Sequence, residues 1–77
     1  MLPRIETVFR EVFDDDHLAV MDSLSPDTFA SWDSFTHVRL LNALAEEFGI
    51  QFTTEDILDA VSVAAIREVL RSKGIAA

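Results

Sequence analysis

The sequence predicts an all-α fold, a four-helix bundle with a long loop between the first and second helices and a short third helix. Hydrophobic residues make up 49% of the 77 residues, and only two glycines and two prolines interrupt the chain. This composition favours helices over disorder. Apolar residues also recur at helical spacing in separate stretches, none of which can bury its apolar stripe alone. We therefore expect the helices to pack together as a single domain over residues 1–77.

The first helix is expected over residues 3–15. Pro3 lies near its start, where the missing backbone N–H costs little. The apolar positions that follow keep helical spacing. They are Ile5, Val8, Phe9, Val12 and Phe13.

A long loop is expected between Asp16 and Asp33. Polar and turn-forming residues surround Ser25-Pro26-Asp27, and no helical periodicity persists there. A connection of this length is unusual in a compact domain unless it is functional or tied down. Its apolar residues should hold it against the bundle, and they are Leu18, Val20, Met21, Leu24, Phe29 and Trp32.

The second helix is expected over residues 34–48, with Asp33 or Ser34 as its N-cap and Gly49 as its C-cap. Its apolar stripe should consist of Phe35, Val38, Leu41, Leu44 and Phe48, with Leu40 beside them. The other side chains should mostly face outward, namely Thr36, His37, Arg39, Asn42, Ala43, Glu46 and Glu47.

Two further helices are expected after the second. Thr53 or Thr54 should cap a short third helix over Glu55 to Ala60. Ser62 should cap the fourth, which is expected to continue until Gly74. The apolar positions of the fourth helix are Val63, Ile66, Val69 and Leu70.

Negative charge is concentrated in the middle of the chain. Fourteen acidic residues against six basic ones give a net charge of −8. Between Glu11 and Ile66 there are twelve acidic residues and one basic residue, Arg39, a net charge of −11. Such a surface repels nucleic acids and anionic membranes and orients partners with basic patches, although solubility alone would also explain it. No apolar run approaches the roughly 20 residues needed to span a bilayer, and no signal peptide is evident, so we expect a cytoplasmic protein without membrane insertion.

No catalytic or metal-binding residue is predicted. The chain has no cysteine, which rules out disulfides, thiolate metal sites and a cysteine nucleophile. The run Asp14-Asp15-Asp16-His17 lacks the alternating ligands and central glycine of a calcium loop, so a solvated helix end is the simpler interpretation. Neither His17 nor His37 has a catalytic constellation around it in the sequence, and His37 is expected to be exposed.

Ser34 is the candidate functional residue because it lies in the first turn of the second helix. The N–H groups of a first turn have no partner inside the helix, and the helix dipole adds partial positive charge there. A phosphate ester on Ser34 would be favoured at this place. The alternative is that the serine only caps the helix, a role worth about 1 kcal/mol.

The segment from Asp33-Ser34-Phe35 to Glu46-Glu47-Phe48-Gly49-Ile50 resembles the core motif of acyl carrier proteins. In that family Asp-Ser-Leu opens a helix that ends in Glu-Glu-Phe-Gly-Ile, and the spacing between the serine and this ending is the same here. With the flanking helices and the long loop, the resemblance covers nearly the whole chain. Asp22-Ser23-Leu24 matches the tripeptide more literally, but it lies eleven residues too far from the ending, so we assign Ser23 to the loop.

The resemblance implies a carrier that is not an enzyme. A phosphopantetheinyl transferase, using magnesium that the transferase holds, would move 4'-phosphopantetheine from coenzyme A to Ser34. The thiol of this group would hold acyl groups as thioesters for partner enzymes with basic docking patches. The carrier would be a monomer, recognised weakly and fast through the second helix, the loop before it and the short third helix. Candidates for lining a cavity between the helices are Phe35, Leu41, Ile57, Val61 and Ile66, although core packing is the default for all of them.

Departures from the family pattern favour a specialised biosynthetic pathway over general fatty acid synthesis. Trp32 precedes the aspartate where fatty acid carriers have a small residue, Phe35 replaces leucine, and Arg39 stands where those carriers commonly have an acid. We expect Arg39 to be a specificity element that pairs with an acid on its proper partner. Asp-Ser-Phe also occurs in D-alanyl carriers. The alternatives are therefore a general fatty acid synthesis carrier, an aminoacyl or D-alanyl carrier, and an unmodified helical adaptor.

Overall fold

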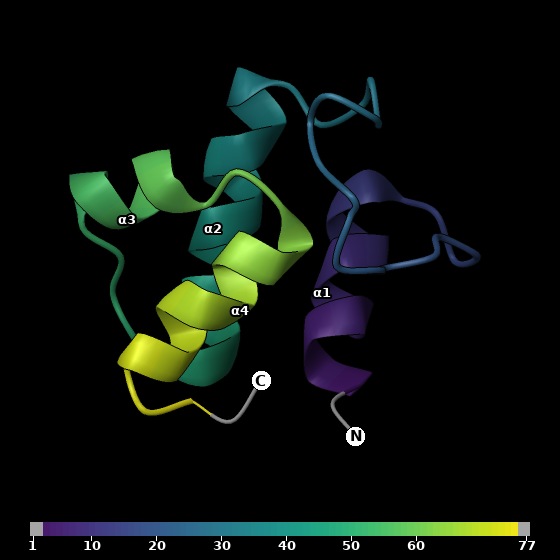
Figure 1. The fold of residues 1–77 in the computed structure, drawn as a ribbon. Coiled ribbons are helices and arrows are strands. Elements are labelled where there is room, and N and C mark those ends of the chain that lie inside the picture. Colours follow the sequence, from purple (N-terminus) through teal and green to yellow (C-terminus); the bar gives the residue numbers. More distant parts are fainter. Residues whose placement is uncertain (1–2, 76–77) are drawn as a thin grey trace.

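Four helices and a long loop make up the part of the chain that the computed structural model describes, residues 3–75 (Figure 1). The helices are α1 (Pro3–Phe13), α2 (Ser34–Phe48), α3 (Thr54–Asp59) and α4 (Val63–Ser72). The expected all-α class, the order of the helices, the long loop after α1 and the short α3 are therefore confirmed. Within residues 3–75, no helix is both long and apolar enough to cross a membrane.

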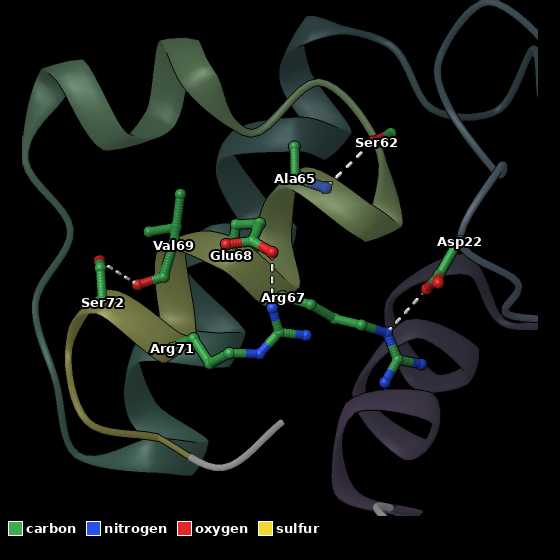
Figure 2. A network of polar contacts seen from close by, with 8 residues as sticks. All are labelled: Asp22, Ser62, Ala65, Arg67, Glu68, Val69, Arg71 and Ser72. Atoms are coloured by element: carbon green, nitrogen blue, oxygen red, sulfur yellow. Dashed lines mark hydrogen bonds and ion pairs between the residues drawn. The ribbon is translucent and has the colours of Figure 1, made fainter.

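Local capping fixes where three of the helices begin. The side chain of Asp33, and not that of Ser34, is the N-cap of α2 and accepts from the Thr36 N–H. Thr53 and Asp56 form a reciprocal capping box at the start of α3. Ser62 caps α4 by accepting from the N–H of Ala65 (Figure 2). These side chains satisfy N–H groups that have no partner within their helices.

Left-handed backbone conformations end α2 and α1. Gly49 has the left-handed φ of 65° and donates its N–H to the carbonyl of Ala45, which confirms the C-cap of α2. α1 ends at Phe13, earlier than expected, because Asp14 adopts a φ of 54°. This turn lets the Asp15 N–H donate to the Arg10 carbonyl at 3.0 Å, a bond that closes the helix.

The core lies between α1, α2 and α4, and α3 lies beside the first half of α2 (Figure 1). Trp32, at the end of the long loop, is 1% exposed and is the largest fully buried side chain. Its ring meets that of Phe9 edge to face, with the centroids 5.5 Å apart. The other buried core residues are Ile5, Val8, Leu18, Val20, Leu40, Leu41, Leu44, Ala60, Val63, Ile66 and Leu70.

The long loop is tied to the bundle by its backbone as well as by its buried side chains. The carbonyl oxygens of Leu24 and Asp22 accept from the N–H groups of Val63 and Ala64, at 3.0 and 3.1 Å, in the first turn of α4. The Asp22 carboxylate also pairs with Arg67 of α4 at 3.0 Å (Figure 2). The expectation that the loop packs down is confirmed.

The predicted apolar stripe of α2 is partly wrong. Leu40, Leu41 and Leu44 are buried, whereas Phe35 and Val38 are 72% and 48% exposed. Phe35 precedes Leu44 by nine residues, which is two and a half helical turns at about 3.6 residues per turn, so the two side chains leave opposite sides of the helix. The buried face is set by Leu40, Leu41 and Leu44 together.

Candidate functional site at the start of α2

Ser34 is the first residue of α2, and its side chain is exposed. Asp33 has extended backbone geometry and turns the chain into the helix, so Ser34 projects at the helix N-terminus. The N–H of Thr36, and more weakly its hydroxyl, hydrogen-bond Asp33 and lower the pKa of its carboxyl below the ordinary value. The N–H of Thr36, one of the donors in the first turn, is therefore bonded to the ionised carboxylate of Asp33.

An open groove of about 560 Å³ lies beside Ser34. Pro26 and Asp27 of the long loop form one side, and the end of α3 with the residues after it forms the other. The full lining is Pro26, Asp27, Trp32, Asp33, Ser34, His37, Ile57, Leu58, Ala60 and Val61. A serine at the rim of a partly apolar groove can present an attached group to solvent or let it lie along the groove.

The expected cavity lining is only partly right. Ile57 and Val61 line the groove, as expected. Leu41 and Ile66 are fully buried and belong to the core, and Phe35 faces solvent. The loop residues of the lining could not be predicted from sequence because their position depends on how the loop folds back.

His37 is not an exposed helix residue, contrary to expectation. It is half-buried and bridges three elements. The indole N–H of Trp32 donates to its Nδ1 at 2.8 Å, and its Nε2 lies 3.0 Å from the carbonyl oxygen of Ile57 in α3. The inward position of His37 could have been predicted from helical register. His37 precedes Leu44 by seven residues and therefore shares the inward face of α2 with Leu40 and Leu41.

Exposed apolar side chains occur on α2 and around the end of α3. Phe35 and Val38 come from α2, and Leu58 and Val61 are 71% and 62% exposed in and after α3. The guanidinium carbon of Arg39 lies 6.0 Å from the centroid of the Phe35 ring, within the range of a cation–π contact. We call Phe35, Val38 and Arg39, which share one exposed side of α2, the outer face.

The remaining sequence candidates lie away from this site. Ser23 is an exposed loop residue. In the run of three aspartates, the Asp15 carboxylate accepts from the N–H of His17, which closes a local turn. Over residues 3–75, no three His, Asp or Glu side chains are grouped so that they could hold a metal ion.

No protein-family model and no curated protein sequence matches this chain. Among solved structures, the chain is similar to the solution NMR structure of a holo acyl carrier protein from Geobacter metallireducens. The two chains are 25% identical, the TM-score is 0.80, and the match covers 94% of this chain and 86% of the other. Nearly all of the described elements are therefore shared, and the chain has an acyl-carrier-protein-like fold.

Proposed function

We propose that this chain, as one carrier domain over residues 1–77, bears acyl groups as thioesters on a 4'-phosphopantetheine arm attached to Ser34. The observation that carries the proposal is the exposed serine at the first position of α2 on the rim of the groove. The similar solved structure is that of a holo acyl carrier protein. The protein is then a platform that presents substrates to enzymes and has no catalytic residues of its own.

The arrangement around Ser34 fits such an arm. A phosphate on Ser34 lies next to the positive end of the α2 dipole and its first-turn N–H groups. The groove walls from Ile57 and Leu58 give an acyl chain an apolar surface. Because the chain has no cysteine, the thiol of the arm is the only thiol that could hold the thioester.

Ser34→Ala is expected to abolish modification. Incubation of the wild-type protein with coenzyme A, magnesium and a broad-specificity phosphopantetheinyl transferase should add the mass of one phosphopantetheine. Ser23→Ala is the matched control, because Ser23 also follows an aspartate but lies in the loop, and this variant should still gain the mass. Intact-mass spectrometry distinguishes the outcomes. Modification at Ser23, or none with several transferases, would contradict the proposal and favour an unmodified adaptor.

A specialised pathway is the proposed setting, and the outer face supports it. Arg39 is the only basic residue between Glu11 and Ile66, and it lies beside exposed Phe35. A partner with an apolar contact for Phe35 and a carboxylate for Arg39 complements this face, whereas a uniformly basic patch would repel Arg39. General fatty acid synthesis and aminoacyl or D-alanyl loading are the alternatives, and the next experiment addresses the first of them through partner choice.

Arg39→Glu is expected to change which enzymes use the protein. Turnover of the Ser34-modified carrier by fatty acid synthesis enzymes should rise about two- to fivefold, and loading by the native partner should fall by a similar factor, since exposed ion pairs are worth about 0.2–1 kcal/mol. Both changes should shrink at high salt. Arg71→Glu makes the same charge change at an exposed position of α4 and serves as the control. Unchanged rates with both enzyme sets would restore general fatty acid synthesis as the preferred setting.

A further inference from the structure

α3 makes a polar contact with a neighbouring part of the chain near each of its ends. The helix has six residues, none of which is fully buried. At its first turn, Asp56 pairs with Lys73, which follows α4, at 2.8 Å. Near its last turn, the carbonyl oxygen of Ile57 lies 3.0 Å from the Nε2 of His37 in α2. Because Ile57 and Leu58 line the groove beside Ser34, whatever holds this end of α3 also sets the width of the groove.

The hydrogen-bond partners of His37 require one protonation state. An indole N–H can only donate, so Nδ1 of His37 must accept from Trp32 and carries no proton. A carbonyl oxygen can only accept, so Nε2 must carry the proton that is donated to Ile57. The neutral ring with its proton on Nε2 satisfies both contacts. A doubly protonated ring would place an N–H against the N–H of Trp32 and lose that bond.

We propose that His37, as the neutral Nε2-protonated tautomer, is a positioning residue that fastens the Ile57 end of α3 to Trp32 and α2 and so fixes this wall of the groove. The proposal rests on the two hydrogen bonds and does not depend on the modification of Ser34. His37 touches no reacting group, and it acts through the position of α3.

The acidic residues that line the groove together with His37 are Asp27 and Asp33, whereas the groove residues from α3 and the segment after it are Ile57, Leu58, Ala60 and Val61. On the α1 side, Phe9 and Phe13 contact the ring of Trp32. Arg39, on the same helix, lies over the exposed ring of Phe35.

The tautomer can be tested directly by nitrogen-15 NMR. The protein has two histidines, and His17 is exposed in the loop and serves as an internal reference. At pH 8, His37 should show a protonated Nε2 and an unprotonated Nδ1. The opposite tautomer, or the mixture of tautomers that an exposed ring shows, would overturn the proposal.

Hydrogen exchange tests the effect on α3. His37→Phe keeps a ring against Trp32 but removes both hydrogen bonds, and we expect amides of residues 57–60 to exchange about tenfold faster, the factor for one hydrogen bond of ordinary net strength. His37→Gln can still donate to Ile57 and should recover part of the protection. His17→Phe is the control and should change nothing. Equal acceleration in α4, judged at Ile66 and Leu70, would mean a general loss of stability and would overturn the positioning role.

Discussion

Trp32→Ala is expected to leave most of the protein unfolded at room temperature. Truncating a fully buried tryptophan costs about 3–5 kcal/mol, and a domain of this size rarely has more than about 3–5 kcal/mol of stability from its core. Trp32 is 1% exposed, packs on Phe9 and Phe13, and donates to His37, so its loss affects the loop, α1 and α2 together. Circular dichroism during urea denaturation would measure the free energy of unfolding.

Trp32→Phe separates packing from hydrogen bonding at the same position. Phenylalanine keeps an aromatic ring against Phe9 but cannot donate to His37, so we expect a loss of about 1–3 kcal/mol and a folded protein. Unfolding of Trp32→Ala at the same urea concentration as the wild-type protein would mean that the Trp32 side chain is not packed in the core.

Leu40→Ala is expected to destabilise the protein far more than Phe35→Ala. Leu40 is 0% exposed, and removing a buried leucine side chain costs about 2–5 kcal/mol. Phe35 is 72% exposed, so its truncation should change the free energy of unfolding by no more than about 0.5 kcal/mol. Thermal and urea unfolding of the two variants measure the difference.

This pair also tests which face of α2 is buried. Val38→Ala, at a position that is 48% exposed, should resemble Phe35→Ala and not Leu40→Ala. A larger loss for Phe35→Ala than for Leu40→Ala would mean that α2 is rotated and that the stripe expected from sequence is the buried one.

The helix starts could be predicted from the sequence because they depend on neighbouring residues. Asp33, Thr53 and Ser62 each accept from an N–H three residues ahead, and that spacing is visible in the sequence. Gly49 similarly ends α2 with a left-handed φ that glycine adopts without strain. Local rules were less successful at the end of α1, where Asp14 adopts the left-handed conformation that short polar residues tolerate.

The inward face of α2 and the role of His37 could not be predicted in the same way. Hydrophobicity placed Phe35 in the stripe and His37 outside it, although helical register puts His37 with Leu40 and Leu44 and Phe35 opposite them. The partner of His37 on α3, Ile57, lies twenty residues away, so the contact exists only once the bundle is packed. The groove depends in addition on Pro26 and Asp27, which follow the path of the loop.

The backbone attachment of the loop to α4 has a consequence for the order of folding. The N–H groups of Val63 and Ala64 find their acceptors on Leu24 and Asp22, which lie far away in the sequence, and not within their own helix. These first-turn N–H groups can therefore find their acceptors within the protein only after the chain has closed a large loop, a step whose entropic cost slows folding. We expect docking of the loop onto α4 to be a late step in folding.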